Sequence, residues 1–391
     1  MIKKRIAELD AKLSSEFEII LWAIREKGNE DNSEKLFESV DWEGVMSLSI
    51  NHGTLPVVYK KISKLKTGLI PSEVLLRFKD VYHKIVRWNL IQSNQLIKVL
   101  KILKKNDIKA IPIKGPVISM QAYGDIGYRM FQDLDLIILP DGFINVYDLL
   151  CKEGYEPSIK LSEKKKKLWN RFRRDIEFKK GKTLIDIHQR ISQGNSSFDI
   201  FKEQFERTEV VGILDQKIDV LSVEDTIVYL CINSAKDQWN SLRMVADLSF
   251  LIRSDPEIDW EVLIKNARSR GILRMILSGL LFISVITKES LPEIVMMEIQ
   301  KDNRVKTLSE KYLSGAFLEF PEKKDPDIVK SLVKTLDSPS RKIRFLLYYF
   351  FTPGAADLRS IKLPAFLFPI YFLIRPLRLF KNIIVHPFKR G

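Results

Sequence analysis

Three aspartates carry the most specific chemical signal in this sequence. Asp133 and Asp135 are separated by one leucine in a run rich in branched apolar residues, and Asp186 lies between two isoleucines. Because alternate side chains of a β-strand share a face, Asp133 and Asp135 are expected to point the same way. Adjacent carboxylates repel each other, and a divalent cation relieves that repulsion. If the strand of Asp186 pairs with the first strand, three carboxylates converge and can hold Mg²⁺ or Mn²⁺, and we expect two ions.

Such a metal site suits transfer of a nucleotidyl group. One ion would lower the pKa of an attacking hydroxyl, and the other would bridge the phosphates and stabilise the departing pyrophosphate. The simpler interpretation stays open, because an isolated Asp-x-Asp is usually a solvated strand end. Asp186 could likewise face solvent, as polar residues on hairpins usually do.

A lysine–glycine–proline sequence predicts a phosphate contact. Gly115 allows a close approach of backbone to phosphate, and Pro116 suits the first turn of a helix whose N-terminus attracts anions. Lys114 would add a point charge, and the guanidinium of Arg129 a fork suited to phosphate oxygens. Lys-Gly is also an ordinary turn, and Arg129 could instead pair with Asp133 or Asp135 to hold the loop.

His188, Lys236 and Arg243 are further candidates for contact with the acceptor or for support of the site. His188 follows Asp186 by two residues, so both share a strand face, where the histidine would orient a carboxylate, contact the acceptor or serve as a structural hydrogen-bonding group. Lys236, Arg243 and Asp247 recur at roughly helical intervals. They either line the cleft or pair on a helix surface.

The elements that position these residues predict an α+β fold. Residues 1–107 read as an N-terminal helical region with a first helix from about Ile6, a short helix opened by Asp41 and a long helix from Pro71 to Asn106. Residues 108–221 read as the nucleotidyltransferase α/β core, with a small mixed sheet that includes a strand over 134–139, a helix after Asp141 and a hairpin over 172–188. Residues 222–391 read as a C-terminal helical region with an apolar-basic tail. Its expected helices cover 222–236, 240–253, 259–286, 291–317 and 326–352, and Ser222 begins the first of them with a capping-box-like pattern.

Composition narrows the class of protein. Only two cysteines occur, Cys151 and Cys231, which excludes a disulfide framework and a Cys-rich zinc site and fits the cytoplasm. No apolar run follows the basic N-terminus, so we expect no export signal. The formal net charge of +14 favours polyanionic partners, although a solvated basic face explains it equally well.

Two basic segments define the alternative functions. Residues 164–174 mix cations with aromatic side chains and could bind nucleic acid, but charge runs are more often solvated. Residues 363–388 are apolar and basic and could contact an anionic membrane surface. More often such a segment packs back onto its own domain, and its prolines argue against a long continuous helix. We therefore favour neither nucleic acid nor membrane as partner.

The ordered set of motifs resembles the uncharacterised nucleotidyltransferase family of the DNA polymerase beta superfamily. The segments that carry the resemblance are Lys114-Gly115, Tyr123, Arg129, Asp133-Leu134-Asp135-Leu136 and Ile185-Asp186-Ile187-His188. Looser likenesses cover Trp42 to Tyr59, Leu242 to Leu248 and Tyr371 to Leu379. The resemblance implies transfer of a nucleoside monophosphate from a nucleoside triphosphate (NTP), such as ATP, to an acceptor that no motif specifies.

The sequence departs from the family pattern in two places. Lys-Gly replaces the superfamily's usual Gly-Ser turn. Asn233 and Asp237 stand where relatives often have histidines, which favours a noncatalytic nucleotide-binding protein as an alternative. The intact carboxylates favour the enzyme, and a basic protein that binds nucleic acid or membrane ranks third.

Overall fold

The computed structural model describes residues 14–25, 36–37, 40–65, 68–172, 175–189, 202–316 and 328–385. The chain forms two compact units. Unit one comprises Met1–Ile97, Ile113–Gln132 and Arg207–Asp337, and unit two comprises Lys98–Pro112, Asp133–Glu206 and Ser338–Gly391. The division into three consecutive regions at residues 107 and 221 stays a prediction. The fold class is confirmed, because a small mixed sheet and a two-stranded sheet occur among helices.

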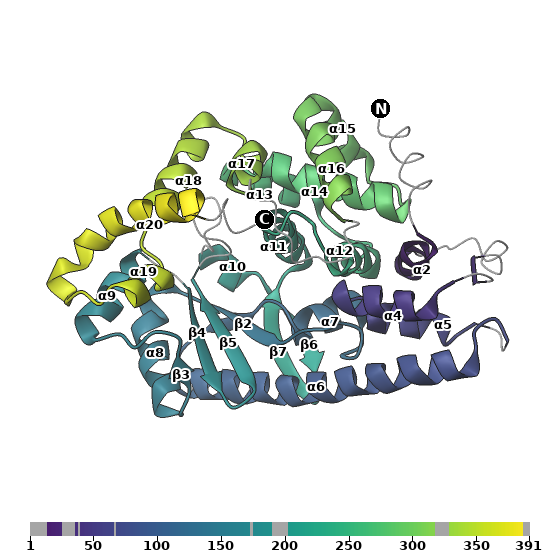
Figure 1. The fold of residues 1–391 in the computed structure, drawn as a ribbon, viewed down its shortest axis with the longest axis horizontal. Helices are drawn as coiled ribbons and strands as arrows, with labels where there is room; N and C mark the ends of the chain where they lie inside the picture. Colours follow the sequence, from purple (N-terminus) through teal and green to yellow (C-terminus); the bar gives the residue numbers. More distant parts are fainter. Residues whose placement is uncertain are drawn as a thin grey trace. The chain divides into compact units, whose positions relative to one another are not determined.

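Unit two contains the five-stranded sheet (Figure 1). Strands β2 and β5 are parallel, and every other neighbouring pair is antiparallel, so the sheet is mixed as predicted. Branched apolar side chains on one face of β2 and β5 are fully buried, which anchors both strands in the core. In the order β1-β2-β5-β4-β3 the strands are β1 (Ala110–Pro112), β2 (Asp133–Ile138), β5 (Thr183–His188), β4 (Asp175–Lys180) and β3 (Glu156–Pro157).

The predicted hairpin is present as β4 and β5, joined at Gly181 with a positive φ of 59°. It begins at Asp175 and not at Phe172, because Phe172 is the last residue of a basic helix. The helix expected after Asp141 starts at Phe143, since Pro140–Gly142 form a 3-10 turn before it. The helices of unit two are η1 (Pro140–Gly142), α8 (Phe143–Lys152), α9 (Glu163–Phe172), α10 (Lys202–Glu206), α18 (Pro339–Phe351), α19 (Ala355–Ser360), η3 (Ala365–Ile370) and α20 (Tyr371–Val385).

Unit one is mainly helical. The long helix runs from Ser72 to Lys105 and passes into unit two after Ile97. Asp41 and Ser222 cap their helices as predicted, each accepting a backbone N–H. The hairpin of β6 and β7 was not predicted. Helices and strands of unit one are α2 (Ser15–Ile24), α4 (Trp42–Asn51), α5 (Leu55–Ile62), α6 (Ser72–Lys105), α7 (Pro116–Tyr123), β6 (Thr208–Ile213), β7 (Gln216–Leu221), α11 (Val223–Lys236), α12 (Leu242–Ser254), α13 (Trp260–Arg270), α14 (Leu273–Thr287), α15 (Glu293–Lys301), α16 (Asn303–Ala316) and α17 (Ile328–Thr335).

Three long helices predicted in the C-terminal half are each divided in two. Gly271, with φ +66°, ends α13 in the left-handed conformation, so α14 starts afresh at Leu273. Asp302 has an extended backbone and separates α15 from α16. Ser338 caps α18, whose first residue is a proline. Residues 6–13 of the first predicted helix lie outside the described residues.

Within the part of the chain that the structure describes, no helix combines the length and the apolar composition required to cross a bilayer.

Candidate active site

The register of β2 and β5 brings two of the predicted carboxylates together. Asp135 lies directly opposite Asp186 in the parallel ladder. Because paired residues project from the same side of a sheet, these two side chains share one face with Asp133 and His188. The alternating apolar residues of the two strands project into the core on the other side, and they are Leu134, Leu136, Ile185 and Ile187.

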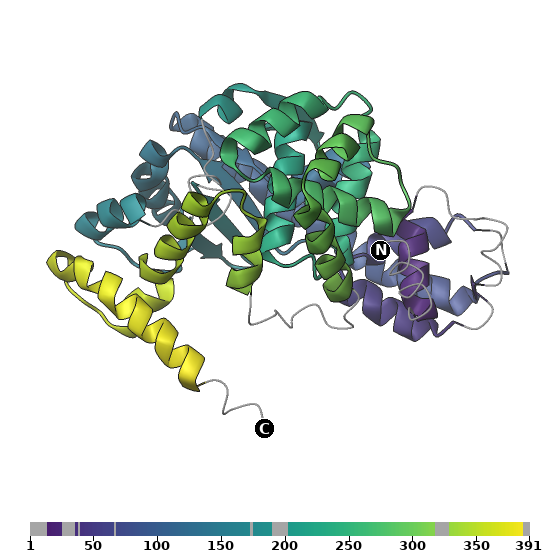
Figure 2. The ribbon, with the colours of Figure 1, turned by 90° about the horizontal axis from the view of Figure 1, so that it is seen from above.

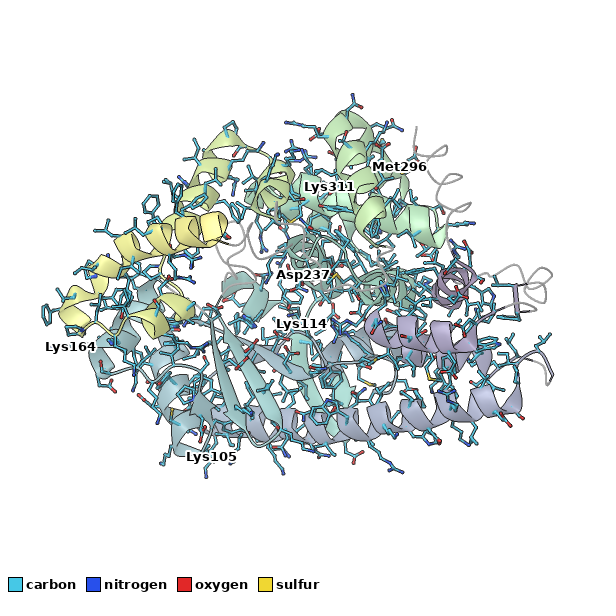
Figure 3. All side chains as sticks on the ribbon, viewed as in Figure 1. Lys105, Lys114, Lys164, Asp237, Met296 and Lys311 are labelled. Atoms are coloured by element: carbon cyan, nitrogen blue, oxygen red, sulfur yellow. The ribbon has the colours of Figure 1, made fainter. Side chains whose placement is uncertain are left out.

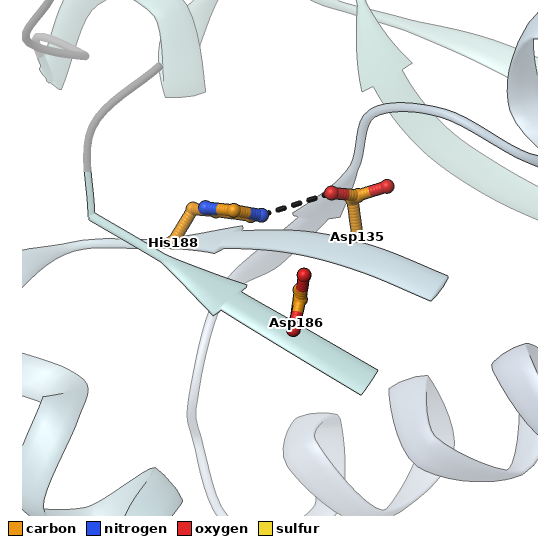
Figure 4. A group of neighbouring side chains, drawn as sticks. All are labelled: Asp135, Asp186 and His188. Atoms are coloured by element: carbon orange, nitrogen blue, oxygen red, sulfur yellow. Dashed lines mark hydrogen bonds and ion pairs between the residues drawn. The ribbon is translucent and has the colours of Figure 1, made fainter. Parts of the chain in front are cut away.

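A hydrogen bond connects this face to the end of β5. His188 Nε2 and Asp135 Oδ1 are 2.9 Å apart (Figure 4). One donor atom from each of Asp135, Asp186 and His188 lies within 4.8 Å of the other two. Asp135 is almost fully buried, with 3% of its surface exposed, while Asp186 and His188 are half-buried. The group therefore has one protected carboxylate and two side chains that solvent reaches.

Asp133 differs from its two predicted companions. It lies on the same face of the sheet, one side-chain repeat before Asp135, and is half-buried. It does not belong to the group whose donor atoms lie within 4.8 Å of one another. His188, which the sequence marked as a support or acceptor residue, occupies that place in the group.

The pKa of Asp186 is strongly shifted. Burial is the main cause that raises the pKa of Asp186 to about 6 from an ordinary value of 3.8. The neighbouring carboxylates Asp135, Asp133 and Glu177 raise this pKa further, whereas His188 lowers it. A cation that replaces the proton on such a carboxylate is stabilised there, because its charge offsets the repulsion from the neighbouring carboxylates.

The lysine–glycine turn has a backbone conformation that favours glycine. Gly115 has φ +54° and ψ −120°, a conformation open to glycine but not to residues with a side chain. It caps α7, and Pro116 is the first helical residue as expected. Lys114 Nζ lies 5.7 Å from the centre of the Tyr229 ring, which is cation–π range (Lys114 is labelled in Figure 3).

Arg129 is held by a residue that sequence reasoning did not assign to it. Its Nε donates to Asp247 Oδ2 at 2.9 Å, and both side chains are almost fully buried. The hydroxyl of Tyr123 donates to the other oxygen of Asp247 at 3.0 Å. Asp247 thus connects two motif residues. Its signals in the sequence were the helical spacing from Arg243 and the loose family likeness of residues 242–248.

Side chains from two helices, α6 and α12, hold the backbone of residues 126–131, directly before β2. Arg243 donates to the carbonyl of Met130, and Trp88 to the carbonyl of Phe131. Asn89 donates to the carbonyls of Ile126 and Arg129. Arg243 therefore acts as a support of this segment. Lys236, the other candidate, is the half-buried last residue of α11.

The profile of a family described as Uncharacterised nucleotidyltransferase matches residues 38–287. The chain belongs to this family. A search of curated proteins found no match. The matched range contains all nine candidate site residues, as well as the likeness seen from Trp42 to Tyr59. The likeness of residues 371–379 to the family lies outside it. Membership indicates nucleotidyltransferase activity and an NTP substrate.

The donor set of this nucleotidyltransferase fits a divalent metal. Two carboxylates offer the hard oxygen ligands that Mg²⁺ and Mn²⁺ prefer, and imidazole nitrogen is acceptable to Mn²⁺ but less so to Mg²⁺. A histidine that hydrogen-bonds a ligating carboxylate is a common way of orienting that ligand. Asp135 and His188 have this arrangement.

The raised pKa of Asp186 predicts how stability of the metal-free protein depends on pH. Between about pH 4 and pH 6 the folded state keeps a proton that the unfolded state has lost, so stability falls as the pH rises. Relative to Asp186→Asn, the wild-type free energy of unfolding should fall across this window by on the order of 2 to 3 kcal/mol. Urea unfolding with chelator at each pH measures the difference. A difference independent of pH would contradict the prediction.

Proposed function

We propose that this chain transfers a nucleoside monophosphate from an NTP to an acceptor and releases pyrophosphate, with a divalent metal held at Asp135 and Asp186. The observation that carries the proposal is the in-register pairing of these two carboxylates on one face of the sheet, with His188 beside them. Membership of a nucleotidyltransferase family supplies the class of reaction.

Each residue on that face has a proposed role. Asp135, Asp186 and Asp133 hold Mg²⁺ or Mn²⁺, and we propose two ions. His188 donates to Asp135 and keeps that carboxylate turned toward the metal. When bound, the metal neutralises charge on the phosphates and lowers the pKa of the attacking group. In the transfer a bond forms between the acceptor atom and the α-phosphorus, and the bond to the bridging oxygen of pyrophosphate breaks.

The roles of the remaining candidates rest on the sequence motif. We propose that Lys114 and Gly115 contact the triphosphate, the glycine through a backbone that no side chain obstructs. For Arg129 the nucleotide contact stays a prediction beside its structural pairing with Asp247. Arg243 supports residues 126–131, and Lys236 is proposed to contact the acceptor.

Thermal stability with each NTP tests the proposal without knowledge of the acceptor. The purified chain would be melted with each of the common NTPs, with and without Mg²⁺ or Mn²⁺. A nucleotide present at about 100 times its Kd stabilises a protein by roughly 2.7 kcal/mol, which is visible as a shift in Tm. We expect a shift for at least one NTP that requires the metal and is absent in Asp135→Asn.

One control variant and two contrary outcomes make the result decisive. Glu177→Gln removes a carboxylate from the neighbouring strand, opposite Asp186, and should leave the shift in place. A folded wild-type protein without a shift for any NTP and metal would overturn the proposal. A shift of equal size without metal would retain nucleotide binding but remove the role of the carboxylates.

A further inference from the structure

A row of large apolar side chains lies exposed along the C-terminal helix. Phe366, Leu373, Leu377 and Phe380 are 80%, 64%, 71% and 65% exposed, and Ile370 is exposed as well. Within α20, the spacing of Leu373, Leu377 and Phe380 by four and three residues places them on one side of the helix. Phe366 and Ile370 lie in η3, directly before α20. We name these five residues the apolar stripe. α20 runs through Pro376, so this proline does not end the helix, contrary to the sequence expectation.

The opposite side of α20 is attached to its own unit. Tyr371 is fully buried, and its hydroxyl donates to the carbonyl of Ile361. Arg375 and Arg378 both bond the buried carboxylate of Asp357 on α19, and Arg375 also donates to the carbonyl of Tyr349 on α18. α18, α19 and α20 therefore pack together, as Figure 2 shows for α18 and α20. The helix is held with its apolar stripe turned outward.

The charge of this segment is strongly one-sided. Ser338–Gly391 contain ten lysine or arginine residues and one acidic residue, Asp357. That one carboxylate is already paired with two arginines. Lys362, four residues before the stripe, is exposed, and so is Arg344 on α18. A surface with this excess attracts anionic partners and repels a second copy of itself.

A second basic element adjoins the same helices. Phe172, the last residue of α9, packs against Phe368 and Phe372 with ring centres 6.0 and 4.9 Å apart. Lys164, Lys167 and Arg171 are exposed at helical spacing on α9 (Lys164 is labelled in Figure 3). We name these three residues the α9 cations. Arg173 and Arg174 of the same basic run lie outside the described residues.

We propose that the apolar stripe and the α9 cations form a surface that docks onto an anionic lipid bilayer. Exposed Phe and Leu side chains on one side of a helix can enter the boundary between headgroups and acyl chains, while neighbouring lysines and arginines contact anionic headgroups. A partner helix fits this surface less well, because the apolar seam between paired helices is normally flanked by charges of both signs. The sequence predicts that residues 363–388 pack back on their own domain, and over residues 371–380 only one side of α20 does so.

Vesicle sedimentation of the full chain tests the docking surface. The protein would be mixed with vesicles of phosphatidylcholine alone or with an equal part of phosphatidylglycerol, at low and high salt. We expect sedimentation with the anionic vesicles at low salt. The triple variant Leu373→Gln, Leu377→Gln, Phe380→Gln should weaken it at least about tenfold, since three inserted apolar side chains are lost. Replacing the α9 cations with glutamine should weaken it and flatten the salt dependence.

A matched control uses exposed apolar residues of α6. Leu76→Gln and Ile91→Gln alter side chains that are 58% and 55% exposed and should leave vesicle binding unchanged. Failure of the wild-type chain to sediment with anionic vesicles at low salt would overturn the proposal. The proposal would also be overturned if analytical ultracentrifugation showed that the wild-type protein is a dimer and the stripe variant a monomer. RNA binding that needs the α9 cations, without vesicle binding, would likewise overturn it in favour of nucleic acid.

Discussion

Replacing Asp135 with asparagine is expected to weaken Mn²⁺ binding by about a hundredfold or more, because the variant loses the charge of a proposed ligand. Asparagine has nearly the same shape and still accepts the hydrogen bond from His188, whose Nε2 lies 2.9 Å from Asp135 Oδ1. The loss should therefore reflect charge and not a change in packing. Titration of free Mn²⁺ by electron paramagnetic resonance measures the affinity directly.

The same variant should be at least as stable as the wild-type protein when metal is absent. Asp135 lies opposite Asp186 and contributes to the raised pKa of that carboxyl, so removing its charge relieves a repulsion. Loss of Mn²⁺ binding together with retained stability in urea would assign the effect to the metal site. Mn²⁺ affinity within about threefold of the wild type, with Glu177→Gln as the reference, would show that Asp135 is not a ligand.

Replacing Asp247 with asparagine is expected to lower the free energy of unfolding by about 3 kcal/mol or more. The carboxylate accepts from Arg129 and Tyr123 in a setting where it and Arg129 are almost fully buried. Asparagine removes the negative charge beside the buried guanidinium, so less of the cost of desolvating that guanidinium is compensated. Burial and the adjoining Asp247 also raise the pKa of Tyr123 well above its ordinary value, so the tyrosine stays a neutral donor.

An exposed ion pair of the same unit provides the control. Arg77 and Glu43 are paired with 55% and 62% of their side chains exposed. Glu43→Gln should change stability by less than about 1 kcal/mol, because water screens such pairs. Urea unfolding of both variants measures the contrast. If Asp247→Asn were no more destabilising than Glu43→Gln, Asp247 would not be the residue that compensates the charge of Arg129.

The sequence predicted structural features that depend on residues close together in the chain. Alternation of aspartate and leucine in β2 sets which side chains share a face, because a strand has a period of two. Asp41 and Ser222 were identifiable as caps because a cap bonds a backbone N–H two or three residues further on. The Lys114-Gly115-Pro116 turn and the family motif around it have the same local character. These signals were enough to predict an α+β nucleotidyltransferase with a carboxylate site.

Other features were decided by contacts between residues far apart in the chain. The register that sets Asp135, and not Asp133, opposite Asp186 depends on pairing of two strands about fifty residues apart. The partner of Arg129 lies 118 residues away, on a helix whose spacing alone did not reveal it. The outward side of α20 also depends on what packs nearby. Local patterns determine which face a side chain occupies, but only closure of long loops in the folded chain determines which faces meet.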